Sequence, residues 1–157
     1  MTTLGQMARR QVDQFLSALF LPEELIELRF IESWLSHGKK RSRVVRAAQW
    51  LQRADVIATH AGLTAFAKRT RANIYFGVCP RPRHGDADDG SIKTVRSVWC
   101  DIDHVCLDEA RNRWTDAGIR QPSIAVSSGS GIHGTGCLSR TCTPRMTTRD
   151  FEQASAL

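Results

Sequence analysis

The sequence predicts an α+β domain with a mostly antiparallel sheet. Three observations support this class: apolar residues at helical spacing near the N-terminus, alternation of apolar residues in the next segment, and a later series of short apolar strands around one helix. The 157 residues are enough for a real core. Because the chain has neither internal repeats nor a clear linker, we expect a single domain over residues 1–157.

The first elements are an N-terminal helix and a β-hairpin. The helix is expected over residues 8–20, ended by Pro22. Its apolar positions are Val12, Phe15, Leu16, Leu19 and Phe20. Apolar and polar residues then alternate over residues 26–31, as in a half-buried strand, and residues 44–47 return as its hairpin partner.

A second helix and a long loop are expected next. Asp55 is predicted to cap a helix that runs to about Arg71, with Val56, Leu63, Phe66 and Ala67 near one face. Residues 73–78 are expected to form a compact apolar strand. Residues 79–91 are rich in turn-forming residues, and a loop of that length is often functional.

The last part alternates strands with one helix. Strands are expected over residues 95–103 and 124–126, separated by a helix from Cys106 to Ala117 that Gly118 ends. A glycine-rich turn then leads to a further strand that carries His133.

The charge balance favours a polyanionic partner. Lys and Arg exceed Asp and Glu by 22 to 16, which gives a net charge of +6. Such an excess suits nucleic acid or nucleotides, although it also serves plain solubility. Lys39–Arg43 and the pair Arg81 and Arg83 are candidates to hold phosphates.

The expected setting is the cytoplasm, without a membrane. No apolar run approaches the roughly 20 residues of a membrane span, and the N-terminus has no secretory signal. Five cysteines without C-x-x-C spacing indicate reduced thiols. Zinc binding around Cys100 is not favoured, because Cys100 and Asp101 must point to opposite faces of a strand.

Two acids end the strand Trp99-Cys100-Asp101-Ile102-Asp103. Residues i and i+2 of a strand share a face and lie roughly 6.5 Å apart. Asp101 and Asp103 should therefore converge, with Cys100 and Ile102 toward the core. Two carboxylates on a rigid strand suit Mg²⁺ or Mn²⁺. The alternative is a solvated strand end that leads into a helix.

A second motif follows about twenty-five residues later as Ser128-Gly129-Ser130-Gly131-Ile132-His133. Glycines let backbone N–H groups approach an anion closely, and the serine hydroxyls add donors. His133 would then be placed to contact a phosphate or sugar. A tight hairpin with an incidental histidine is the alternative, and the segment is not a Walker loop because no Gly-Lys-Ser/Thr follows.

Together, Asp101-x-Asp103 and Ser128-Gly-x-Gly-x-His133 resemble the archaeo-eukaryotic primase superfamily, in particular its RepB-like plasmid and phage branch. Three upstream segments look like the same branch, so the resemblance covers about residues 12–134. The segments are Ile26-Glu27-Leu28-Arg29, Asn73-Ile74-Tyr75-Phe76-Gly77-Val78-Cys79-Pro80-Arg81 and Val95-Arg96-Ser97-Val98-Trp99.

The resemblance implies a DNA primase/polymerase-type nucleotidyltransferase with an RRM-like catalytic core. It implies that Asp101 and Asp103 hold Mg²⁺ or Mn²⁺, and that His133, helped by Ser128 and Ser130, contacts the nucleoside triphosphate. Arg29 and Arg96 would contact phosphate or template. The implied partners are a single-stranded DNA template and a helicase or other replication protein.

The chain departs from the family after His133. The family has a third acidic ligand on a later strand, whereas residues 135–157 do not resemble an apolar strand, and neither Asp150 nor Glu152 is assigned as that ligand. We therefore expect a truncated, weakly active or inactive copy whose tail is read out of frame. A shifted frame of the coding DNA should then contain Tyr-Trp-Leu.

Three other functions remain. A non-catalytic module that binds single-stranded DNA or nucleotides would use the basic surface. A rolling-circle nuclease needs a His-hydrophobe-His pair and a catalytic tyrosine, but Ile132-His133 lacks the first histidine and Tyr75 lies in an apolar strand. A phosphohydrolase with Asp101 as nucleophile would need a parallel sheet and further motifs that are not found.

Overall fold

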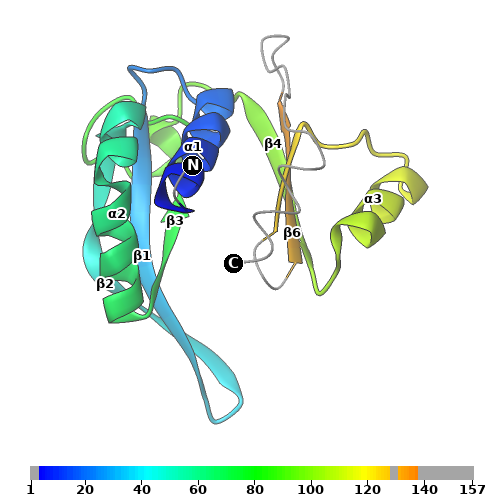
Figure 1. Cartoon of the computed structure of the whole chain (residues 1–157), viewed down its shortest axis with the longest axis horizontal. Coiled ribbons are helices and arrows are strands. Elements are labelled where there is room, and N and C mark those ends of the chain that lie inside the picture. The colour runs from blue at the N-terminus through cyan, green and yellow to red at the C-terminus, as the bar shows by residue number, and fades with distance from the viewer. Residues whose placement is uncertain (1–3, 128–130, 138–157) are drawn as a thin grey trace. The chain divides into compact units, whose positions relative to one another are not determined.

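The structure is a computed structural model, and it describes residues 4–127 and 131–137. These residues form three α-helices and two three-stranded antiparallel sheets, which confirms the predicted α+β class (Figure 1). The chain divides into two compact units, Met1–Val95 and Arg96–Leu157. Each unit is described by itself.

The first unit contains the predicted helix, hairpin, helix and strand in that order. They are α1 (Leu4–Leu19), β1 (Leu25–Ser36), β2 (Lys39–Gln52), α2 (Arg53–Thr70) and β3 (Ala72–Phe76). The sheet order is β2-β1-β3, and both pairs are antiparallel. The hairpin is much longer than the alternation indicated.

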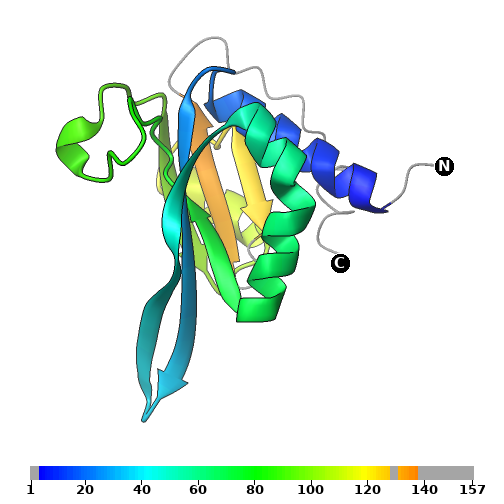
Figure 2. The same ribbon diagram turned by 90° about the vertical axis from the view of Figure 1, so that its left-hand side faces the viewer.

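The core of this unit lies between the sheet and its two helices. Ile26, Leu28 and Phe30 alternate on one face of β1 and are buried, as predicted. Phe30 meets Phe66 of α2 edge to face with the ring centroids 5.5 Å apart, an arrangement that aromatic pairs prefer. α1 and α2 lie side by side on this face (Figure 2).

The start of α2 corrects one prediction. Gln52, not Asp55, is the N-cap residue, and Asp55 lies inside the first turn. The reason is that β2 continues directly into α2 without a loop, so the helix begins two residues before Asp55. Asp55 still places its charge near the helix N-terminus, where the helix dipole favours an anion.

The hairpin turns in two residues. His37 and Gly38 have φ values of 49° and 73°, and Ser36 pairs with Lys39 on either side of them. Two positive φ values in a two-residue connection favour the strand twist of a hairpin. The turn end of the hairpin projects beyond the helices and β3 of its unit (Figures 1 and 2).

The second unit contains β4 (Ser97–Asp103), α3 (Leu107–Asp116), β5 (Ile124–Ser127) and β6 (Gly131–Cys137). β6 lies between β4 and β5 and is antiparallel to both. Along the chain, α3 connects β4 to β5, and β6 separates these two strands in the sheet. The buried centre consists of Ala110 and Trp114 of α3 with Ile132 of β6. Among the described residues, no helix is long and apolar enough to cross a membrane.

Candidate functional site

Asp101 and His133 face each other across two neighbouring strands. They are direct partners in the β4–β6 ladder, and the imidazole Nε2 lies 3.0 Å from the carboxylate Oδ1. The two side chains are 49% and 52% exposed. Opposite residues of an antiparallel pair share a face, so the sheet itself brings the two predicted motifs together.

Asp103 continues this face of β4. It lies two residues beyond Asp101, is exposed, and has Gly131 as its partner on β6. Asp101 and Asp103 are thus on one face of the strand, as the spacing predicted. Ile102, on the other face, packs against the α3 cluster.

The two carboxylates fit one kind of Mg²⁺ or Mn²⁺ site. Among residues 4–127 and 131–137, no group of three or more His, Cys, Asp or Glu side chains is gathered to hold a metal ion. Mg²⁺ is commonly held by one or two carboxylates, with waters and substrate phosphates as the other ligands. The described residues thus form no closed structural metal site, and the two carboxylates of β4 match in number what the protein supplies to a Mg²⁺ site of this open kind.

Packing on the α3 side holds β4 and β6 in register. Trp114 donates a hydrogen bond from Nε1 to the Sγ of Cys100 at 3.3 Å, and its ring lies against Gly134. A Cβ at Gly134 would come within 2.7 Å of the Trp114 ring. Cys100 thus faces α3 as predicted, although the residue remains exposed rather than buried.

The glycine-rich segment is described only in part. Gly131 opens β6, and a Cβ there would collide with the backbone carbonyl of Ile102. The close approach of β4 is thus a structural reason for this glycine, beside the anion binding predicted for it. Ser128, Gly129 and Ser130, two of which are predicted nucleotide contacts, lie outside the described residues.

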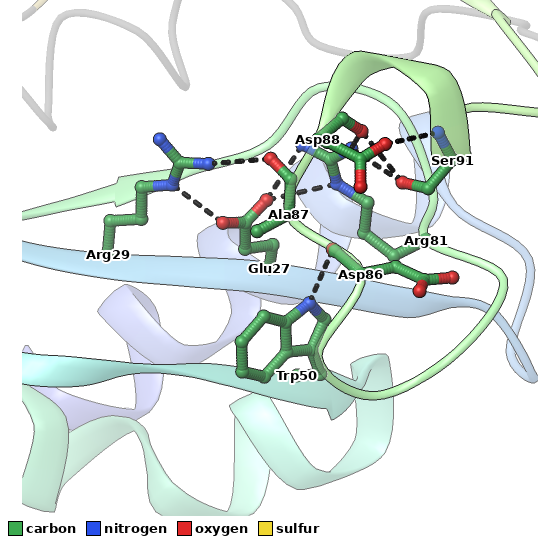
Figure 3. Close-up of polar contacts among 8 residues, drawn as sticks. All are labelled: Glu27, Arg29, Trp50, Arg81, Asp86, Ala87, Asp88 and Ser91. Atoms are coloured by element: carbon green, nitrogen blue, oxygen red, sulfur yellow. Dashed lines mark hydrogen bonds and ion pairs between the residues drawn. The ribbon is translucent and has the colours of Figure 1, made fainter.

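Arg29 belongs to the first unit, whereas Asp101 and His133 belong to the second. Its Nε donates to Oε1 of Glu27 at 2.6 Å, and its Nη2 donates to the backbone oxygen of Ala87 at 3.3 Å (Figure 3). Half of the Arg29 side chain is exposed. The described structure gives Arg29 partners within the network around Glu27.

Glu27 is the centre of a polar network that the sequence did not reveal. Its side chain is 1% exposed, and its Oε2 accepts from Nε and Nη2 of Arg81 at 3.0 and 2.8 Å. The guanidinium groups of Arg29 and Arg81 therefore both neutralise this buried carboxylate. A carboxylate shielded from water needs such charged partners. Two features of the sequence could have indicated this network: a single acid between apolar strand residues, and an arginine in a distant turn-rich loop.

Arg81 attaches the predicted functional loop to the sheet. Its Nη1 donates to the backbone oxygen of Asp88 at 2.9 Å and to Oγ of Ser91 at 3.3 Å, and Trp50 donates to the oxygen of Asp86 (Figure 3). Arg81 is 8% exposed and is committed to these contacts. We therefore assign it a structural role rather than phosphate binding, whereas Arg83 remains exposed.

Comparisons of the chain with protein-family models, with curated proteins and with solved structures each found no match. The residues and their geometry are therefore what indicate the function. The pairing of Asp101 with His133 is the feature that connects both sequence motifs.

Proposed function

We propose that this chain is a DNA primase/polymerase-type nucleotidyltransferase domain that acts in plasmid or phage DNA replication. The observation that carries the proposal is the contact of Asp101 with His133 across adjacent strands, with Asp103 next along the same face. The described residues of both motifs thus lie on adjacent strands. The two side chains are about half exposed.

The topology of the second unit supports the proposal. β4, α3 and β5 form a split β-α-β unit around β6, which is the arrangement expected for one half of an RRM-like core. In this arrangement the central strand carries His133 and its neighbour carries both acids. The RRM-like core is part of the proposal.

Each residue has a proposed role. Asp101 and Asp103 would hold Mg²⁺ or Mn²⁺, which when bound stabilises charge on the attacking and leaving oxygens. His133, whose Nε2 lies beside Asp101 in this structure, would contact the triphosphate. The resemblance implies that Ser128 and Ser130 are further nucleotide contacts. It implies the same of Arg29, which in this structure is bonded within the Glu27 network of the first unit.

The reaction would be attack of a 3′-hydroxyl oxygen on the α-phosphorus of the bound nucleotide. The new P–O bond replaces the bond to pyrophosphate, and the hydroxyl proton passes to solvent. The single-stranded template and a helicase or replication protein are proposed partners, in the cytoplasm. Because the described residues supply two carboxylates where the resemblance implies three, we expect weak or no primer synthesis.

Manganese-dependent nucleotide binding tests the proposal. The variant D101N/D103N should lose the Mn²⁺-dependent binding of a labelled nucleoside triphosphate by at least tenfold, because both hard oxygen ligands become amides. Binding of Mn²⁺ itself, followed by the loss of its free electron-spin resonance signal, should fall in parallel. This readout does not require turnover.

The matched control is D108N/E109Q. It removes the same charge from α3, where both acids are exposed and make surface ion pairs with Arg111 and Arg113. The control should bind as the unaltered chain does. Equal binding by D101N/D103N would refute the site, and nucleotide binding without any metal dependence would favour the non-catalytic binding module instead.

A further inference from the structure

The turn end of the β1–β2 hairpin is a projecting basic arm, defined here as residues 32–43. It contains four basic residues, Lys39, Lys40, Arg41 and Arg43, against the single acid Glu32. The four basic residues are all exposed. Figures 1 and 2 show the arm extending beyond the helices of its unit. None of residues 32–43 belongs to the buried core.

One face of the arm combines an aromatic ring with cations. Trp34 is the direct partner of Arg41, and Glu32 is the direct partner of Arg43, so these four side chains share one face of the hairpin. Lys39 lies two residues before Arg41 and belongs to the same face. The Arg43 guanidinium lies 6.0 Å from the centre of the Trp34 ring. Trp34 is nevertheless 43% exposed, which leaves part of its ring free for another group.

A pocket of about 590 Å³ lies at the base of the arm. Arg43 joins the pocket to the arm, and Arg69 and Arg71 enter it from the end of α2. The remaining lining residues are Glu32, Val44, Val45 and Thr70. Three guanidinium groups and one carboxylate, that of Glu32, thus line the pocket. The carboxylate of Glu32 accepts from Nε of Arg43 at 2.7 Å.

We propose that the arm and this pocket bind single-stranded nucleic acid. A base would stack on Trp34 while Lys39, Arg41 and Arg43 contact the backbone phosphates, and the pocket would take a further phosphate. Aromatic platforms flanked by cations bind single strands without sequence preference, and guanidinium groups match phosphate geometry. A duplex is less suited, because its stacked bases present no free face to Trp34.

This site is separate from Asp101, Asp103 and His133 and does not depend on the proposed function. It lies in the first unit and needs neither a metal nor a nucleoside triphosphate. The two proposals can therefore fail independently. D101N/D103N should retain oligonucleotide binding, and the arm variants below should retain Mn²⁺-dependent nucleotide binding.

The test is fluorescence anisotropy of a labelled oligo(dT) with the full chain over a series of KCl concentrations. K39Q/R41Q/R43Q should weaken binding and reduce the slope of log affinity against log salt by about 2, since each single-strand phosphate contact contributes about 0.7. W34A should weaken binding about fivefold or more, because one stacking contact is lost. W34F, which keeps a ring, should bind close to the unaltered chain.

The control is R9Q/R10Q/K93Q, which removes three exposed positive charges outside the arm. It should leave the salt slope nearly unchanged. The proposal is overturned if the arm variant and this control behave alike, or if W34A binds as tightly as W34F. Equal or tighter binding of a matched duplex would overturn the assignment to single strands.

Discussion

At the scale of single residues, Gly134 is important because it has no side chain. Gly134 lies against Trp114, whose indole also donates to Cys100. The sequence showed this glycine only as the residue after His133. Its role is to let α3 approach β6 closely on the face opposite His133, and this packing holds the strand that carries the candidate site.

We predict that G134A destabilises the protein by about 1 to 3 kcal/mol, because the added methyl group overpacks against the Trp114 ring. Gly136, two residues along the same strand, is the matched position, since its nearest side-chain neighbour, Val98, would lie at an ordinary 3.4 Å. Thermal unfolding of both variants measures the difference. A G134A variant as stable as G136A would contradict this packing role.

A second prediction concerns His133. H133A should lower Mn²⁺-dependent nucleotide affinity, because a contact with the phosphates is lost, yet leave Mn²⁺ binding without nucleotide unchanged, because both carboxylates remain. Paired titrations, with metal alone and with metal and nucleotide, separate the two effects. Parallel loss of both would instead make His133 a metal ligand.

At the scale of elements, the structure depends on a contact between β1 and a loop more than fifty residues later. The alternation of apolar residues correctly predicted that Ile26, Leu28 and Phe30 are buried. The same alternation placed Glu27 on the solvent side, because sequence spacing does not reveal that a loop covers that face. The sequence could not show that a distant loop covers this face of β1. It likewise showed Asp101 and His133 only as members of two separate motifs, and not their contact.

The variant E27Q tests this loop attachment. Loss of the charge leaves the Arg81 guanidinium buried without its counter-ion, so we expect a loss of about 3 kcal/mol or more in stability. Hydrogen exchange in residues 79–91 should accelerate. The control D86N alters a pair in the same loop whose arginine, Arg83, is exposed, and it should cost less than about 1 kcal/mol. Similar effects of both variants would refute the role of Glu27.

At the scale of the whole molecule, the chain consists of two compact units with separate centres. The first is built around the buried face of β1, and the second around Ala110, Trp114 and Ile132. The sequence shows no linker-like change in composition near residue 95. The boundary is therefore a property of the strand pairing, because β1 pairs with β2 and β3 whereas β4 pairs with β6.

This division predicts that residues 1–95 fold without the rest of the chain. The fragment keeps all three strands of its sheet, both of its helices and the Glu27 network. We expect a cooperative thermal transition by circular dichroism and dispersed amide resonances. Because the arm and its pocket belong to this unit, the fragment should also bind oligo(dT) with the salt slope of the full chain.

The control for that fragment is F30A, which removes a fully buried ring that packs on Phe66. A loss of about 3 to 5 kcal/mol should abolish or strongly broaden the transition. A fragment without a cooperative transition would show that the first unit needs the second for its stability. A folded fragment that does not bind oligo(dT) would instead show that the first unit is stable by itself and that its arm is not the nucleic-acid site.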